Sequence, residues 1–254
     1  MSLLIINFVL LVLYMTNWYV VGRRTQRLDV ADTAWGGGFV IIALSSVFFR
    51  ASGTTLLLLV LVLLWGSRLA LHIWRRNVVK GPDPRYHELS SRWSKKLFWL
   101  RAYFSVFIVQ AILVFMVSLP VTLTALATSP PNNLLVIVGA VVWLIGFLFE
   151  AIADRQLKKF ITNTANRGSV LSSGLWKYSR HPNYFGEILL WWGIAIVAYG
   201  AHANGLLILG PITITALLLF VSGIPSVERR YKTNSSYQTY ARRTSILIPL
   251  PPRS

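Results

Sequence analysis

The sequence predicts an all-α, multi-pass integral membrane protein with seven transmembrane helices, its N-terminus outside and its C-terminus in the cytosol. The 254-residue chain is 55% hydrophobic and has a mean hydropathy of +0.58, values too apolar for an ordinary soluble domain. Seven apolar segments are long enough to cross a bilayer, and basic residues concentrate in every second connection between them. The simplest organisation is one membrane domain over residues 1–254.

Each span is predicted from a run of apolar residues bounded by polar or turn-forming ones. The seven spans cover residues 3–21, 30–49, 54–74, 98–126, 134–153, 184–200 and 206–224. The fourth should bend near Pro120, because proline breaks the hydrogen bonding of a helix interior. The fifth should continue as a polar helix through Phe160, and a polar loop is expected over 75–96. The sixth should begin near Pro182, since proline costs nothing in a first turn.

The charges decide the orientation of these spans. The chain has 25 Lys and Arg against 8 Asp and Glu, a formal net charge of +17. Connections after the first, third, fifth and seventh spans hold nearly all the basic residues, whereas the others hold only Arg50. The positive-inside rule and anionic lipid headgroups explain this charge, so no nucleic-acid partner is expected. The chain has no cysteine and its four histidines lack ligand spacing, so no metal site is expected.

The stretch 174–192, G-L-W-K-Y-S-R-H-P-N-Y-F-G-E-I-L-L-W-W, is the strongest candidate for a site. Within eight positions it offers a guanidinium, an imidazole, an amide, a phenol and a carboxylate, from Arg180, His181, Asn183, Tyr184 and Glu187. Asn183 and Glu187 are four residues apart and share a helix face. Such a cluster at a membrane edge suits a polar ligand. The alternative is an interfacial anchor of Arg, Trp and Tyr.

Two further groups of polar residues lie in or beside the apolar spans. A charge at membrane depth costs several kcal/mol unless it is paired or hydrated, so four acids are functional candidates: Asp32, Glu150, Asp154 and Glu187. The alternative is pairing with arginine at the interface. Arg68, His72 and Arg76 follow one another at intervals of four residues and share a helix face, which suits phosphate or carboxylate recognition. The alternative for the arginines is snorkelling to headgroups.

Several motifs resemble a known superfamily of membrane enzymes. The stretch G-L-W-K-Y-S-R-H-P-N-Y-F-G-E at 174–187, a late Glu228 and the tail Y-Q-T-Y-A-R-R-T-S-I-L-I-P at 237–249 occur in this order. They resemble the steroid 5-alpha-reductases, the sterol reductases and the isoprenylcysteine carboxyl methyltransferases. The motifs D-x-x-W-G from position 32, W-G-x-R-L from 65 and F-E-A-x-A-D-x-Q-L from 149 are similar to the bacterial steroid-5-alpha-reductase-like DUF1295 group.

The resemblance implies a membrane reductase that binds NADPH at its cytosolic end. Residues 134–254 would form the cofactor-binding half and 1–126 the substrate-side helices. The cofactor-binding candidates are Arg68, Asp154, Arg155, Trp176, Tyr178, Arg180, His181, Asn183, Tyr184, Glu187, Glu228, Tyr240 and Arg243. The catalytic candidates are Asp32, His72 and Glu150. The implied reaction is hydride transfer to the β-carbon of an α,β-unsaturated carbonyl lipid entering from the bilayer.

Two other functions remain open on sequence grounds. R-H-P-x-Y-x-G also occurs in the isoprenylcysteine methyltransferases, so a methyltransferase using S-adenosylmethionine is the second reading. A non-enzymatic membrane protein is the third, although polar residues gather at one face rather than at mid-depth. The Gln-Glu pair of the steroid enzymes is not evident in the second span, where Asp32 and Trp35 stand instead. Steroid specificity is therefore not predicted. The expected location is the bacterial inner membrane, with the active site facing the cytosol.

Overall fold

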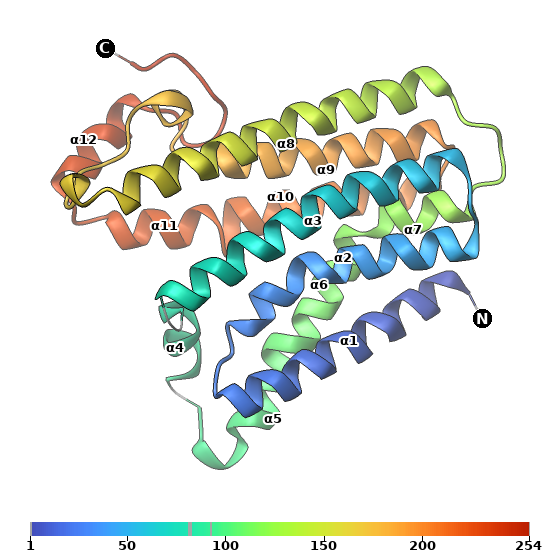
Figure 1. The fold of residues 1–254 in the computed structure, drawn as a ribbon, viewed down its shortest axis with the longest axis horizontal. Coiled ribbons are helices and arrows are strands. Elements are labelled where there is room, and N and C mark those ends of the chain that lie inside the picture. Colours follow the sequence, from blue (N-terminus) through green and yellow to red (C-terminus); the bar gives the residue numbers. More distant parts are fainter. Residues whose placement is uncertain (1, 81–82, 92, 254) are drawn as a thin grey trace. The chain divides into compact units, whose positions relative to one another are not determined.

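The computed structural model describes residues 2–80, 83–91 and 93–253. In this part of the chain the secondary structure consists of helices and one isolated β-bridge, between Ser179 and Ser245 (Figure 1). The chain divides into two units. The first contains Met1–Asn132 and Ala198–Gly210, and the second contains Asn133–Val197 and Pro211–Ser254. The all-α prediction is confirmed for the described residues.

The first unit consists of the N-terminal helices and one short element from late in the chain. Its elements are α1 (Leu3–Thr25), α2 (Val30–Phe49), α3 (Gly53–Lys80), α4 (Pro84–Ser90), η1 (Lys95–Leu97), α5 (Phe98–Ala102), η2 (Tyr103–Ile108), α6 (Val109–Val117), α7 (Leu119–Leu126) and η5 (Gly205–Ile208). Helices α2 and α3 approach closely because both present glycine: a Cβ added to Gly36 would lie 2.4 Å from the carbonyl oxygen of Gly66. The Asn7 amide donates to Thr122 at 2.9 Å and joins α1 to α7.

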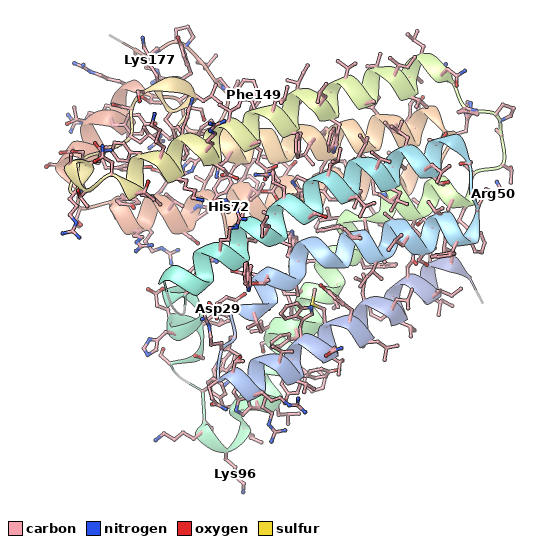
Figure 2. The ribbon with its side chains drawn as sticks, viewed as in Figure 1. Asp29, Arg50, His72, Lys96, Phe149 and Lys177 are labelled. Carbon is pink, nitrogen blue, oxygen red and sulfur yellow. The ribbon has the colours of Figure 1, made fainter. Side chains whose placement is uncertain are left out.

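Most of the labelled charged and polar residues of the first unit lie toward the same end of it (Figure 2). Asp29, His72 and Lys96 lie toward one end of this unit, and Arg50 lies at the opposite end (Figure 2). Arg50 donates to the carbonyl oxygen of Ala127, which ties the connection after α2 to the end of α7. The side chain of Arg76, predicted to share a face with Arg68 and His72, lies outside the described side chains.

The second unit is built on two long antiparallel helices, α8 (Asn133–Thr162) and α9 (Pro182–Gly200), which run side by side (Figure 1). Four glycines allow the close approach: Gly139 and Gly146 on α8, and Gly186 and Gly193 on α9. A Cβ at Gly186 would lie 2.5 Å from the backbone nitrogen of Glu150. The remaining elements are η3 (Thr164–Asn166), η4 (Gly174–Lys177), α10 (Leu209–Ala216), η6 (Leu217–Val221), α11 (Ile224–Tyr231) and α12 (Ser235–Arg243).

Six described helices are long and apolar enough to cross a membrane. They are Leu3–Thr25, Val30–Phe49, Gly53–Arg75, Lys95–Val117, Asn133–Thr162 and Gly205–Tyr231. They support a multi-pass membrane protein. The predicted span 184–200 is helical as part of α9, but α9 is not among the six. Its first turns carry Asn183 and Glu187, which lower its mean hydropathy.

The predicted bend near Pro120 is confirmed: the fourth span breaks at Ser118, where α6 ends, and Pro120 lies in the first turn of α7. The prediction of a loop over 75–96 was wrong in part, because α3 continues to Lys80 and α4 follows. Asp83 caps α4 by accepting a hydrogen bond from the Arg85 backbone at 3.0 Å.

Candidate functional site

The loop before α9 is fixed to α8 by two hydrogen bonds and by an apolar cluster of Ala153 with Leu171 and Trp176. The backbone N–H of Leu175 donates to the side chain of Gln156 at 3.0 Å, and the Trp176 indole donates to the carbonyl oxygen of Ala153 at 3.1 Å. Gly174 has φ of 61° and packs on Gln156, so a side chain at this position would be strained and crowded. Trp176 therefore positions the loop that precedes the site residues.

The C-terminal tail holds the same loop from the other side. The Arg180 backbone donates to the carbonyl oxygen of Ser245 at 2.8 Å, and the Ser179 hydroxyl donates to that of Leu247 at 2.7 Å. From α12, the Tyr240 hydroxyl donates to the carbonyl oxygens of Trp176 at 2.5 Å and Ser179 at 3.2 Å. Residues more than 60 positions apart thus fix the backbone that presents Arg180 and His181.

Three donors converge on the carboxylate of Glu228 in α11. Arg180 Nη1 donates to one oxygen at 2.7 Å, and the other oxygen lies 3.0 Å from His181 Nε2 and 2.6 Å from the Tyr237 hydroxyl. The side chains of His181 and Arg180 are 3% and 12% exposed, against 27% for Glu228. Charge-assisted bonds of this kind are the strong ones, because one or both partners are ionised. We call these four residues the Glu228 network.

Burial sets the protonation of the network. It lowers the pKa of His181 against the smaller opposing effect of Glu228, so the imidazole is neutral at pH 7 and donates its Nε2 proton to the carboxylate. Burial also raises the pKa of Tyr237, and the hydrogen bond to Glu228 raises that pKa further. Burial raises the pKa of Tyr240 as well. The imidazole of His181 stacks on the Tyr184 ring, with centroids 5.4 Å apart and planes 4° apart.

Asn183 connects the start of α9 to α8. Its Nδ2 donates to Asp154 Oδ1 at 3.2 Å, which fixes the orientation of the amide because a carboxylate can only accept. Its Oδ1 is buried and has no hydrogen-bond partner among the described residues, and the same holds for Arg180 Nε. An acceptor and a donor three residues apart in the sequence thus have no hydrogen-bond partner in the described part of the chain.

The other predicted residues of the second unit lie in different environments. Glu150 is 3% exposed, at the close crossing of α8 with Gly186. Tyr184 and Glu187 are half-buried on the first turns of α9. The side chains of three further candidates are exposed: Arg155, Tyr178 and Arg243.

Three predicted residues belong to the first unit: Asp32, Arg68 and His72. Asp32, on the first turn of α2, accepts from Arg85 at 2.7 Å and from the Tyr86 hydroxyl at 2.6 Å, both on α4. The Asp32 carboxylate is therefore held by α4. Arg68 and His72 are half-buried on α3.

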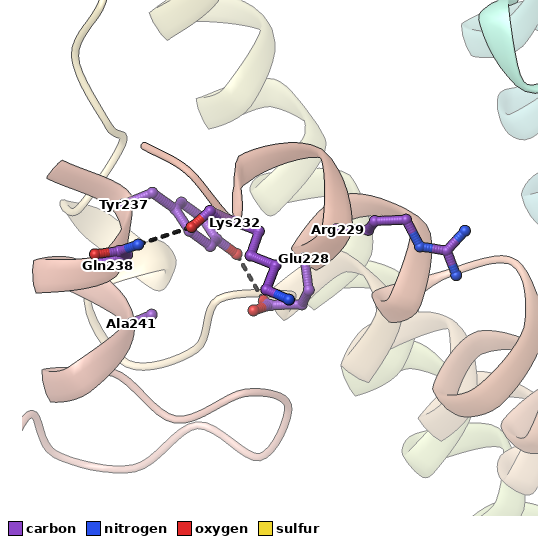
Figure 3. A pocket seen from close by; sticks show the side chains of 6 residues that line it. All are labelled: Glu228, Arg229, Lys232, Tyr237, Gln238 and Ala241. Atoms are coloured by element: carbon purple, nitrogen blue, oxygen red, sulfur yellow. Dashed lines mark hydrogen bonds between the residues drawn. The ribbon is translucent and has the colours of Figure 1, made fainter. Parts of the chain in front are cut away.

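An open pocket of about 480 Å³ lies beside the Glu228 network (Figure 3). Glu228 and Tyr237 form one part of its lining, and the rest comes from Arg229, Lys232, Gln238 and Ala241. Gln238 Nε2 donates to the carbonyl oxygen of Lys232 at 2.7 Å and ties α12 to the end of α11 (Figure 3). The pocket gives the network an approach from outside the helices.

Three residues that build the site were not among the predicted cofactor-binding or catalytic residues: Gln156, Ser179 and Tyr237. Tyr237 carried a usable signal, because Y-Q-T-Y places it three residues before Tyr240 and therefore on the same helix face. Gln156 and Ser179 were visible only as members of longer motifs. Their partners, the Leu175 backbone and the tail, follow from the fold.

The searches of curated proteins and of solved structures found no match. A family model described as "Protein of unknown function (DUF1295)" matches residues 18–244. The match includes the motifs of the second, third and fifth predicted spans, all four members of the Glu228 network, and α12. The predicted family is confirmed: the chain belongs to the DUF1295 family.

Proposed function

We propose that this protein is an NADPH-dependent membrane reductase that transfers a hydride to the C=C bond of an α,β-unsaturated carbonyl lipid. The observation that carries the proposal is the pair of buried, unsatisfied atoms at the start of α9, the donor Arg180 Nε and the acceptor Asn183 Oδ1. Unsatisfied polar atoms in a buried site cost about 1–3 kcal/mol each, so their persistence favours a ligand that satisfies both.

The residues present fit a nicotinamide nucleotide. A carboxamide carries one acceptor and one donor, which complement Arg180 Nε and Asn183 Oδ1. Four residues would hold the nicotinamide end: Arg180, Asn183, Tyr184 and Glu187. Glu228 and Tyr240 would support them, since Glu228 holds Arg180 and Tyr240 fixes the loop before it. The phosphates of the cofactor suit the basic residues of the same unit.

The protein residues have separate tasks in this proposal. Asp154 orients the Asn183 amide, and the Glu228 network fixes Arg180 and His181 before any ligand arrives. When bound, NADPH would supply the hydride for the β-carbon. An acidic side chain hydrogen-bonded to the carbonyl oxygen would stabilise the enolate, and a proton would complete the α-carbon. Asp32, His72 and Glu150 remain the candidates for that acid.

The proposed topology has seven spans, with α9 counted beside the six apolar helices. Its 19 residues give a length of about 28 Å, close to the hydrocarbon thickness of a bilayer. With the N-terminus outside, the basic connections and the Glu228 network face the cytosol, where NADPH is available. In a bacterium the membrane would be the inner one. A lipid substrate would then enter from the bilayer.

A double-label experiment tests this function with a mixture of candidate substrates. Protein reconstituted with a bacterial lipid extract is incubated with NADPH deuterated at both C4 hydrogens of the nicotinamide, or with S-adenosylmethionine deuterated in its methyl group. Untargeted mass spectrometry then identifies labelled lipids. We expect a lipid that gains one deuterium from the labelled NADPH and one proton from water, and at least tenfold less product with Asn183→Ala.

The controls separate the competing functions. Ser236→Ala is exposed on α12, outside the pocket lining and the proposed cofactor contacts, and should retain activity within about twofold of wild type. A lipid that gains the labelled methyl group would instead identify a methyltransferase. The reductase proposal fails if the wild type transfers no more deuterium from NADPH than Asn183→Ala does.

A further inference from the structure

The C-terminal tail presents a narrow apolar face that no helix of its own unit covers. Residues 244–253 follow α12 through a series of bends beside the loop at 176–180, to which the tail is bonded through Ser179, Arg180 and Tyr178, and the Arg253 N–H donates back to the carbonyl oxygen of Arg243. Alternate side chains point outward: Ile246, Ile248 and Leu250 are 44%, 58% and 50% exposed. We call these three residues the tail face.

The last part of the tail, residues 249–252, has a backbone suited to a site with little water. In residues 249–252 the three prolines have no N–H group, and the fourth residue, Leu250, donates its N–H to the carbonyl oxygen of Tyr178 at 3.0 Å. Every donor in this stretch is therefore absent or satisfied. Unsatisfied N–H groups are what exclude irregular backbone from apolar surroundings, so this stretch can approach lipid at low cost.

The charges around the tail face have one sign. From Arg229 to the end of the sequence there are six Lys or Arg and no Asp or Glu. Arg242, Arg243 and Lys177 are exposed near the beginning of the tail and the loop it contacts, and Arg253 is exposed near its end. Exposed apolar side chains flanked by cations are typical of segments that lie in the headgroup region of anionic bilayers.

We infer that the tail face is a membrane-surface contact: Ile246, Ile248 and Leu250 insert at shallow depth into the anionic leaflet, and the flanking arginines bind its headgroups. The tail begins 13 residues after the apolar helix segment Gly205–Tyr231, so its chain position lies close to the membrane. Because the tail is bonded to Ser179 and Arg180, this contact would tie the loop of the Glu228 network to the bilayer surface.

The absence of cysteine allows a direct test on the full chain. Ile248→Cys is labelled with an environment-sensitive NBD fluorophore, and the protein is placed in nanodiscs containing one third phosphatidylglycerol. Quenching is measured with a shallow lipid-attached nitroxide and with aqueous iodide. Ser236→Cys, exposed on α12, serves as the matched label.

We expect the label at 248 to be quenched at least threefold more by the lipid nitroxide than the label at 236, with the reverse order for iodide. In nanodiscs of phosphatidylcholine alone the lipid quenching at 248 should fall at least twofold. The inference fails if iodide reaches both positions equally, or if lipid quenching does not depend on anionic lipid. It also fails if position 248 is protected only in nanodiscs that hold two copies of the protein. None of these outcomes depends on NADPH, so they are separate from the proposed function.

Discussion

The guanidinium of Arg180 and the carboxylate of Glu228 are joined by a 2.7 Å hydrogen bond across 48 residues of sequence. The bond connects the start of α9 to α11, and the same carboxylate also engages His181 and Tyr237. One acid thereby fixes the loop before α9, the last long helical segment and α12. We expect the second unit to depend on this carboxylate.

Glu228→Gln should lower stability by about 1–3 kcal/mol, because it removes the charge that the poorly exposed Arg180 requires. The measurement is thermal unfolding in detergent at pH 7.5. Glu88→Gln is the matched control, since Glu88 is exposed on α4 and its change should stay within about 0.5 kcal/mol. Equal melting temperatures for the two variants would contradict a structural role of Glu228.

Stability should also depend on pH through His181. Burial places the pKa of His181 in the folded protein below its ordinary value of 6.5, so the unfolded chain binds the proton first as the pH falls. The contribution of the neutral imidazole is therefore complete above pH 6.5 and is lost as the pH falls below it. Melting temperatures from pH 8 to pH 5 should decline more steeply for wild type than for His181→Gln.

His87→Gln provides the comparison, because His87 is exposed on α4. This variant should follow the wild-type pH profile. If His87→Gln and His181→Gln flatten the profile equally, the buried imidazole is not the source of the pH dependence.

The packing of α8 against α9 predicts a strong effect at Gly186. A methyl group there would lie 2.5 Å from the Glu150 nitrogen and 2.6 Å from the Gly146 oxygen, both backbone atoms that cannot move aside locally. Gly186→Ala should cost about 1–3 kcal/mol. Gly205→Ala meets no atom within 4 Å and should be neutral or slightly stabilising. A Gly186→Ala protein as stable as Gly205→Ala would contradict the close crossing.

The loop at 176–180 depends on the hydroxyl of Tyr240 in α12, which donates to two of its carbonyl oxygens. Tyr240→Phe should leave these acceptors unsatisfied, cost about 1–3 kcal/mol and increase hydrogen exchange in residues 176–180. Tyr199→Phe is the control because Tyr199 is 64% exposed. Unchanged exchange in Tyr240→Phe would show that the loop at 176–180 is held by other contacts.

The proposed orientation can be read from single cysteines in the cysteine-free chain. Ser129→Cys and Ser235→Cys both occupy exposed positions. In intact bacterial cells, a membrane-impermeant maleimide should label position 129 and should reach position 235 only after permeabilisation. Labelling of position 235 in intact cells would show that the topology is the reverse of the one proposed.

Much of the fold was predictable, because long apolar runs have few alternatives to helices in a membrane. The start of α9 at Pro182 follows from the proline, and the continuation of α8 through Phe160 was expected; α8 ends two residues later, at Thr162. The error over 75–96 has a local cause. The basic residues that end the apolar run are good helix formers, so α3 continues past its apolar end, and Asp83-Pro84 is a helix-start signal within the supposed loop.

The site was predictable residue by residue but not as a network. Arg180, His181 and Glu228 were all candidates, yet a separation of more than 45 residues gives no indication that they share one carboxylate. Tyr237 was not among the predicted cofactor-binding residues, because the position of a tyrosine in a basic tail does not by itself indicate a particular role. Asp154 was predicted as an acid at a span edge, and the structure shows that it orients Asn183.

Titration of detergent-purified protein with NADPH and with S-adenosylmethionine tests the central claim most directly, with Asn183→Ala and Glu187→Ala beside the wild type. We predict saturable NADPH binding to the wild type, at least tenfold weaker binding to both variants, and no saturable binding of S-adenosylmethionine. Ser236→Ala, exposed on α12 and outside the pocket lining, should bind NADPH as the wild type does. Binding of S-adenosylmethionine alone, or NADPH affinity unchanged in both variants, would contradict a nicotinamide site at the start of α9.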